Sequence, residues 1–481
     1  MFKHRIFLSF LCILFSTNMA NAQEKLTLSL NEAILLSVRS NPNVLSSRLN
    51  YVIQKFNLHV QEWQFDPHYS FEASATSNRQ NYNTQFTTGD RNYNISPGVS
   101  LQTPIGTQLS LVANNPVTNH YNPGLSLQIM QPLMRGFGKA VVEAALYDAK
   151  DTEVISRLSI EGVMRNTVSA VINAYLDLMS AERALQIDQE AVKRATHSVE
   201  QTKIFIKAGH KAGNELVTVQ ATVASSRAQV QSDYNNLQQA RYALLSAIGM
   251  DPNTEVSISK LDVPQLIQQY HSPSLSDTKQ RTLENDIQYQ IDRITLHGPT
   301  TRNLLLAEDN TRWQLNLTAS ATTGSGGGGG KNAGVNSLFN GSSESQTVSL
   351  NLQIPIDDQV AKQGVLNAKI ALKQAELALS QEKWSKETNA INGWNLVSNA
   401  RQAMRYAEDA EKLQERTYHI SYQKYLHGLI DSLELQSAQI QLIQAQQTLL
   451  AAQVNYVKSL VNLDLLIGHT LKTWDIKARL S

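Results

Sequence analysis

The chain has 481 residues, with 42 Lys and Arg against 41 Asp and Glu, a formal net charge of +1 at pH 7. This balance gives no support to a nucleic-acid-binding protein, which needs a basic surface. The only cysteine is Cys12, so the rest of the chain can form no disulfide, thiol nucleophile or cysteine metal site. The histidines include no HExxH motif and no i, i+4 pair, and we expect neither a metal nor a cofactor.

The amino end has the features of a secretory signal peptide. Lys3 and Arg5 precede an apolar run from Ile6 to Phe15, and residues 20–22 read Ala-Asn-Ala. We expect residues 1–22 to be removed, which leaves 40 basic and 41 acidic residues and a net charge of −1. No later run is long and apolar enough for a membrane helix, which needs ~20 residues. A closed β-barrel is then the remaining way to span a membrane.

The distribution of prolines predicts very long helices. No proline lies between Pro132 and Pro252, and none follows Pro355. Both stretches are rich in strong helix formers, and proline inside a helix costs ~3 kcal/mol. From Lys139 to Lys207 there are 69 residues, enough for a helix of roughly 100 Å. Because a bilayer core is only ~30 Å thick, such helices must project into the periplasm.

The two proline-free stretches are copies of one unit. Gly209 and Gly428 mark the turn of each predicted hairpin, Gly249 and Gly468 mark its end, and both pairs are 219 residues apart. Apolar residues also recur every seven positions in both copies, which favours coiled-coil packing. These residues are Leu216, Val223, Val230, Leu237 and Leu244, with Leu435, Leu442, Leu449, Tyr456 and Leu463 in the second copy.

Alternating segments before each hairpin predict membrane strands. Apolar and polar residues alternate around residues 69–75, 125–129, 313–321 and 348–354, the pattern of a strand between lipid and lumen. Two further segments near residues 93–113 could enter the barrel or form an outer loop. Four to six strands per chain fall short of the ~8 in the smallest single-chain barrels, so several chains must share one barrel.

These observations divide the chain into an amino-terminal signal and two repeats. The first repeat covers residues 23–250, with strands at about 69–133 and a hairpin at about 139–248. A connecting region follows at 251–285. The second repeat covers 286–468, with strands at about 313–356 and a hairpin at about 360–467, before a tail at 469–481.

Several motifs together resemble the TolC family of outer-membrane factors. They are SLNEAILLSVRSNPNV, LQIMQPL, LQIPI, the endings AIGM and LLIG, and the run YQKYLHGLIDSLELQSAQIQLIQAQQTLLAAQVNYVKSLVNLDLLIG. The resemblance implies a mixed α/β membrane protein: a trimeric transmembrane β-barrel, usually of twelve strands, continued by a long periplasmic α-helical barrel. It also implies a tunnel closed at its periplasmic end, a periplasmic adaptor, and an inner-membrane pump of the RND or ABC type.

The resemblance also points to residues at the hairpin tips. Family members often carry an acid six residues after each tip glycine, here Glu215 and Glu434, and a tyrosine three residues before the second glycine, here Tyr425. These residues would form the periplasmic constriction, where a ring of carboxylates favours cations. The alternative is an acid that only caps the first turn of the returning helix. The tip residues expected to dock the adaptor or pump are Gly209, His210, Gly428 and Leu429.

Two departures from the family pattern concern the tips. Ser437 stands where some members have a further acid, and the first tip carries Lys207, His210 and Lys211 where many have apolar residues. We therefore expect a less negative constriction and leave the choice of adaptor open.

The function that these features favour is a passive outer-membrane duct of a tripartite efflux or type I secretion system, and not an enzyme. The run from Ser325 to Asn332 fails as a phosphate loop, because Ser325 and Asn332 replace the required glycine and Ser or Thr. The alternative is a trimeric coiled-coil structural or adhesive protein of the outer membrane. The transported substrate, whether drug, detergent or protein, is not encoded in these motifs.

Overall fold

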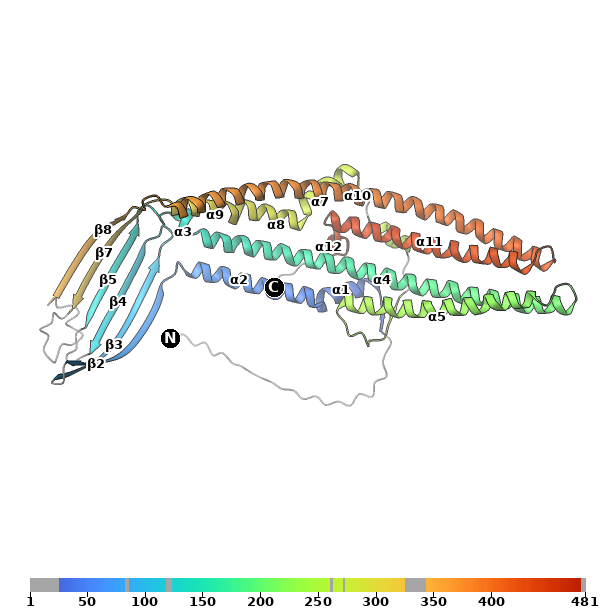
Figure 1. Cartoon of the computed structure of the whole chain (residues 1–481), viewed down its shortest axis with the longest axis horizontal. Coiled ribbons are helices and arrows are strands. Elements are labelled where there is room, and N and C mark those ends of the chain that lie inside the picture. The colour runs from blue at the N-terminus through green and yellow to red at the C-terminus, as the bar shows by residue number, and fades with distance from the viewer. Residues whose placement is uncertain are drawn as a thin grey trace.

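The computed structural model shows a long molecule with a sheet at one end and helical hairpins at the other (Figure 1). The structure describes residues 26–82, 86–117, 123–259, 263–270, 273–324 and 343–476. The predicted signal peptide, the glycine run 326–330 and the last five residues of the predicted tail lie outside these ranges. None of the described helices has an apolar stretch long enough to cross a membrane.

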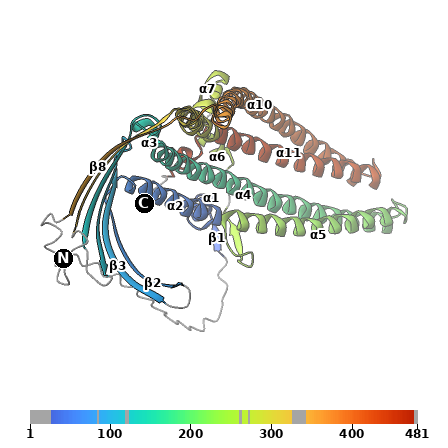
Figure 2. The ribbon, with the colours of Figure 1, turned by 60° about the vertical axis from the view of Figure 1, so that its left-hand side comes forward.

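One antiparallel sheet contains strands from both halves of the chain. Its order is β2-β3-β4-β5-β7-β8, so β5 of the first half pairs with β7 of the second. Figure 2 shows the sheet as a curved layer beside the helices. The bounds are β2 (His68–Tyr82), β3 (Phe86–Gln102), β4 (Gln108–Val117), β5 (Gly124–Pro132), β7 (Gln314–Gly324) and β8 (Ser343–Gln353).

The hairpin near residues 93–113 joins this sheet as β3 and β4. The family's usual twelve strands in a trimer would need four per chain. The described residues of this chain form a sheet of six, so it departs from that expectation.

The sheet has one apolar face across all six strands. Because side chains alternate and paired residues share a face, the register assigns one set of apolar residues to the same side. Tyr69 is 85% exposed and Val348 75% exposed on that side in the single chain. The set comprises Tyr69, Phe71, Ala73, Ala75, Tyr93, Ile95, Val99, Leu101, Leu109, Leu111, Ala113, Leu125, Leu127, Ile129, Leu315, Leu317, Ala319, Ala321, Val348, Leu350 and Leu352.

Two hairpins with unequal arms form the other end of the molecule. The outgoing helices are α4 (Ala144–Lys207) and α10 (Gln359–Leu426), of 64 and 68 residues. At ~1.5 Å per residue each is about 100 Å long. The returning helices α5 (Glu215–Ile248) and α11 (Ser432–Leu466) have 34 and 35 residues and cover only the half nearer the tips.

The half nearer the sheet is completed by shorter helices. There α2 (Pro42–Trp63) packs on α4, and α9 (Thr301–Asn310) packs on α10 (Figure 1). A π-helical turn, η1 (Leu296–Thr300), contains Pro299 and links α9 to α8 (Ile287–Thr295). Proline has no N–H to donate, which explains why the regular helix is interrupted there.

Short elements surround the middle of the helical body. They are β1 (Leu26–Leu28), α1 (Leu30–Ser40), β6 (Val256–Ile258), α6 (Val263–Gln269), α7 (Leu275–Asn285) and α12 (Thr470–Thr473). The one-turn helix α3 (Lys139–Val142) lies instead at the junction of the sheet and the helices (Figure 1). β1 and β6 pair in parallel although 230 residues separate Leu26 from Val256. Tyr175 of α4 is fully buried beneath them, and its hydroxyl lies 3.2 Å from the Leu28 carbonyl oxygen and 3.1 Å from that of Ser259. The main apolar core therefore lies at this middle level.

Candidate functional site at the hairpin tips

The two hairpin tips turn in the same way. Gly209 and Gly428 have φ of 74° and 70°, the left-handed conformation that glycine adopts without a Cβ clash. In the first tip the His210 N–H donates to the Phe205 carbonyl at 2.9 Å, and in the second the Leu429 N–H donates to the Lys424 carbonyl at 2.9 Å. This pattern is a Schellman C-cap, which satisfies the last carbonyls of each outgoing helix.

The returning helices begin differently at the two tips. Asp431 is the N-cap of α11, and its carboxylate accepts from the Glu434 backbone N–H at 2.8 Å. Glu434 lies exposed in the first turn, where the helix dipole favours a negative charge. In the first tip Asn214 makes no side-chain cap, and Glu215 begins α5.

A buried lysine occupies the space between the tips. The Lys211 side chain is only 7% exposed, and its Nζ lies 2.9 Å from Glu215 Oε2. The same ammonium is 4.0 Å from the centre of the Tyr425 ring and 3.4 Å from the Ile430 carbonyl oxygen. Burying an ammonium is costly unless it is paired, and these three partners together provide the pairing.

Tyr425 connects the second hairpin to the first. Its side chain is fully buried, and its hydroxyl lies 2.7 Å from Thr202 Oγ1 on α4. Thr202 donates its own proton to the Ser198 carbonyl at 2.7 Å, so the Tyr425 hydroxyl is the donor to Thr202. The Phe205 ring packs edge-on against Tyr425, with 5.7 Å between ring centres.

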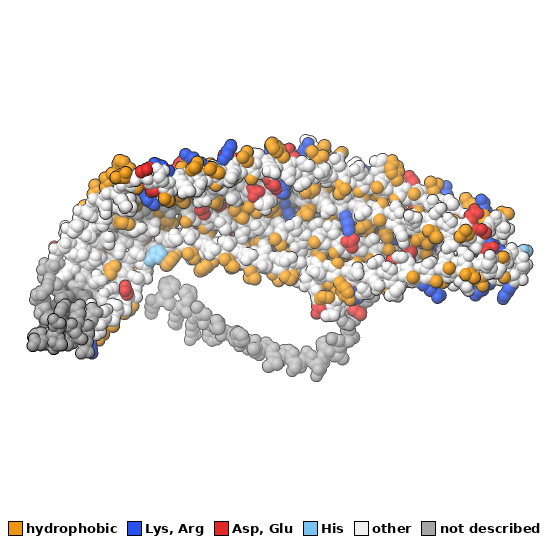
Figure 3. All heavy atoms as spheres, viewed as in Figure 1, with side chains coloured by type: hydrophobic (Ala, Val, Ile, Leu, Met, Phe, Trp, Pro, Cys, Tyr) orange, Lys and Arg blue, Asp and Glu red, His pale blue; other side chains and the backbone are white. Residues whose placement is uncertain are grey.

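A groove of about 620 Å³ lies between the tips. His210, Gly428 and Leu429, three of the residues expected to dock a partner, line it together with Lys211 and Glu215. The two predicted acids therefore differ: Glu215 faces the groove and is paired with Lys211, whereas Glu434 is exposed outside the lining. Figure 3 shows acidic and basic side chains close together at this end of the molecule.

Sequence reasoning missed Thr202 and Phe205, and it treated Lys211 only as a departure from the family pattern. Thr202 and Phe205 lie within a long helix whose composition is ordinary, and no spacing rule connects them to Tyr425. The polar cluster arises because the two tips, 219 residues apart in the sequence, pack against each other.

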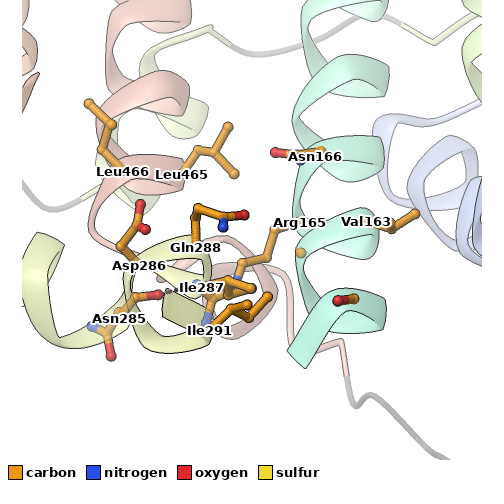
Figure 4. A pocket seen from close by; sticks show the side chains of 12 residues that line it. Val163, Arg165, Asn166, Asn285, Asp286, Ile287, Gln288, Ile291, Leu465 and Leu466 are labelled. Atoms are coloured by element: carbon orange, nitrogen blue, oxygen red, sulfur yellow. Dashed lines mark hydrogen bonds between the residues drawn. The ribbon is translucent and has the colours of Figure 1, made fainter. Parts of the chain in front are cut away.

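A second cleft, of about 440 Å³, lies at the middle level between α4, α8 and the end of α11 (Figure 4). Arg165 reaches into it and donates to the Asn285 carbonyl at 2.8 Å, and it also pairs with Glu161. Ile287, Ile291 and Leu466 supply much of the remaining lining. Because Arg165 is committed to these partners, the cleft is a packing junction between the two repeats.

Two buried carboxyl groups meet inside the helical body between the core and the tips. Asp188 of α4 and Asp233 of α5 are 3% and 5% exposed. Burial, followed by the hydrogen bond and charge of Asp233, raises the pKa of Asp188 to about 7. Gln447 of α11 donates to Asp188 Oδ2 at 3.1 Å, so three helices meet at this pair. In the described part of the chain, no group of three or more His, Cys, Asp or Glu is arranged to hold a metal ion.

Comparison with solved structures finds the same fold in outer-membrane channels. CmeC of Campylobacter jejuni superimposes with a TM-score of 0.69 at 14% identity, covering 91% of this chain and 85% of that one. The open state of MtrE of Neisseria gonorrhoeae gives 0.68 at 17% identity, with coverage of 91% and 88%. VceC of Vibrio cholerae gives 0.65 at 14% identity, with coverage of 92% and 95%. No curated protein matches the sequence.

The sequence itself matches the family described as outer membrane efflux protein, over residues 39–250 and 310–469. The two matched segments make up more than half of the chain and include both helical hairpins with their tips. The chain therefore belongs to the outer membrane efflux protein family.

Proposed function

We propose that three copies of this outer-membrane efflux protein form the passive exit duct of a tripartite efflux or type I secretion system. The proposal rests on one observation: a single chain combines a sheet that has one apolar face with helical hairpins about 100 Å long. The apolar face of the sheet can contact bilayer lipid, and hairpins of this length can form the wall of a tunnel through the periplasm. The duct itself catalyses no reaction, and the energy comes from an inner-membrane transporter.

The tips are the proposed contact with the other components. A periplasmic adaptor and an RND or ABC transporter would dock at the groove around Gly209, His210, Gly428 and Leu429. Leu429 is 72% exposed beside paired charges, a combination that suits a protein interface with an apolar centre and a polar rim. Glu215, Glu434 and Tyr425 would form the constriction, with Lys211 neutralising part of its negative charge.

The adhesive or structural alternative fits the sheet less well. A coiled-coil adhesin needs one membrane anchor at one end of the chain. Here strands from residues 68–132 and 314–353 are interleaved with helical segments and join in one sheet through β5 and β7. That arrangement favours a duct, in which both halves contribute to one wall.

Two measurements test the proposal together. Purified protein in a planar bilayer should conduct ions, and the intact gene should restore the resistance of a deletion strain to detergents, dyes and antibiotics.

Leu350→Lys, on the apolar face, should reduce assembly in the membrane, because a lysine facing mid-bilayer lipid costs ~2–4 kcal/mol. Asn351→Lys, on the opposite face of the same strand, is the matched control and should assemble normally. A protein that assembles but never conducts would refute the duct.

A further inference from the structure

The β3–β4 hairpin lies in the middle of the sheet and not beside it. β3 pairs with β2 from His68↔Ser100 to Tyr82↔Phe86, and β4 pairs with β5 from Gln108↔Met130 to Asn114↔Gly124. An outer loop would leave β2 next to β5. Here the hairpin separates these two strands completely, so removing it would break the continuous sheet of the chain.

The hairpin shares the two-sided character of the other strands. Tyr93, Ile95 and Val99 of β3 are on the apolar side, together with Leu109 and Leu111 of β4. The opposite side carries a polar network, in which Asn94 Nδ2 lies 2.9 Å from Ser96 Oγ and Ser96 Oγ lies 3.2 Å from Asn114 Oδ1. A strand pair between lipid and a water-filled lumen requires this alternation, whereas a solvated loop does not.

The turn between β3 and β4 is fitted to the helical end of the sheet. The Ile105 carbonyl accepts from the Gly138 N–H at 3.2 Å, just before α3 begins. Gly106 has φ of 95°, and a Cβ at that position would lie 2.7 Å from the Gly136 carbonyl oxygen. The turn therefore packs against the strand-to-helix junction, as expected for a fixed part of the barrel wall.

The two edge strands of the sheet run in directions that allow them to pair between copies. Among the described strands, β2 and β8 are at the two ends of the order, so each is paired on one side only. β2 leads away from the helices and β8 returns toward them (Figure 1), so the β8 of one copy can continue the sheet antiparallel with the β2 of the next. Unpaired strand edges are not tolerated in lipid, which requires that another chain cover both.

We propose that the β3–β4 hairpin adds two strands per copy to the membrane wall, so that three copies close a barrel of eighteen strands through β8–β2 seams. The number of copies, three, rests on the proposed function. The number of strands in each copy, six, does not depend on that function. Barrels of 16–18 strands enclose an aqueous channel, so the membrane section is wide and the hairpin tips limit the size of the cargo.

The first test is cryo-electron microscopy of the purified assembly in lipid nanodiscs. Eighteen strands around a threefold axis are expected. A barrel of twelve strands would overturn the inference. It could arise with residues 86–117 outside the wall, or with only two copies in the ring. A monomer in lipid would instead contradict the proposed duct, so the two failures can be told apart.

Cysteine cross-linking provides a second test in whole cells. Cys12 is the only cysteine, so Cys12→Ser gives a cysteine-free background. Ala73→Cys with Ile95→Cys, a register pair on β2 and β3, should form a bond within one chain. Ala73→Cys with Leu127→Cys should not, because two strands separate these positions; the opposite result would overturn the inference.

The seam requires bonds between copies. Phe71→Cys on β2 combined in turn with cysteines at Val348, Leu350 and Leu352 on β8 should give dimer and trimer bands on a non-reducing gel. The single-cysteine variants are the controls. If the trimer is present but no position along β8 cross-links two copies, the proposed seam is wrong.

Discussion

The Nζ of Lys211 lies 4.0 Å from the centre of the Tyr425 ring, although the two residues belong to different hairpins. The contact is formed inside a buried cluster, because Lys211 is only 7% exposed and Tyr425 has no exposed surface. Glu215 balances the charge on one side of the ammonium and Thr202 accepts from the tyrosine on the other. The two tips are therefore tied together by one continuous set of polar contacts.

This link predicts that Tyr425 holds the tips in the arrangement seen here. Tyr425→Ala should remove ring packing worth about 3 kcal/mol, enough to shift a closed-to-open equilibrium by more than ~100-fold. We expect a higher basal conductance of the trimer in a planar bilayer. Tyr425→Phe loses only the hydrogen bond to Thr202, about 1 kcal/mol, and should have a much smaller effect.

Tyr406→Phe is the matched control, because Tyr406 lies on the same helix and is 64% exposed. Its conductance should equal that of the wild type. Equal conductance of Tyr425→Ala and the wild type would show that the contact does not hold the tips together.

Ion selectivity should depend on the balance between Lys211 and the two acids. Glu215→Ala combined with Glu434→Ala is expected to raise anion permeation relative to cation permeation, because it removes two carboxylates per copy near the tips. Lys211→Met should act in the opposite direction, since it leaves Glu215 without its partner. Reversal potentials in a salt gradient measure both effects. An unchanged reversal potential in the double variant would count against the carboxylate ring.

Sequence patterns could predict the features that repeat along the chain. The proline-free stretches, the tip glycines 219 residues apart and the period-two strands all follow from local rules. The partners of Lys211 could not be predicted in this way, because Tyr425 and Ile430 reach it only after two separate hairpins pack together. The place of residues 93–113 was open for a similar reason: alternation defines two strands, but only pairing with β2 and β5 decides where they lie.

The four glycines that end the hairpin helices should differ strongly in their tolerance of alanine. All have positive φ, which costs an alanine ~1–2 kcal/mol. At Gly209 and Gly428 an added Cβ meets nothing within 4 Å. At Gly249 it would lie 2.9 Å from Asn41 Cα, and at Gly468 it would lie 2.5 Å from Asn285 Cβ. Gly249→Ala and Gly468→Ala should therefore lower the unfolding temperature more than the two tip variants.

Thermal unfolding of the four single variants, followed by circular dichroism, measures this difference. The tip glycine of the same repeat is the control for each hairpin-end change: Gly209→Ala for Gly249→Ala, and Gly428→Ala for Gly468→Ala. If Gly428→Ala destabilised the protein as much as Gly468→Ala, the close packing against Asn285 and Arg165 would not be the cause.

The buried pair of Asp188 and Asp233 predicts that stability depends on pH. The pKa of Asp188 is about 7 in the folded protein, against an ordinary value near ~3.9 in an unfolded chain. Between these two values the folded state binds the extra proton, so the stabilising effect is complete below pH ~4 and is lost as the pH rises through 7. Asp233, Gln447 and Arg194 are the polar and charged groups acting on Asp188 from the three helices.

Asp188→Asn replaces the titrating carboxyl group with a neutral amide, which can still donate a hydrogen bond to Asp233. We expect this variant to unfold at a higher temperature than the wild type at pH 8, and the difference to shrink at pH 5, where the wild-type acid is protonated. Asp409→Asn, an exposed change on α10, is the control and should keep the wild-type pH dependence. Parallel unfolding temperatures of Asp188→Asn and wild type from pH 5 to pH 8 would mean that Asp188 carries no proton in the folded protein. The charge of Asp188 would then stay buried among the three helices at every pH in this range, at a cost to stability.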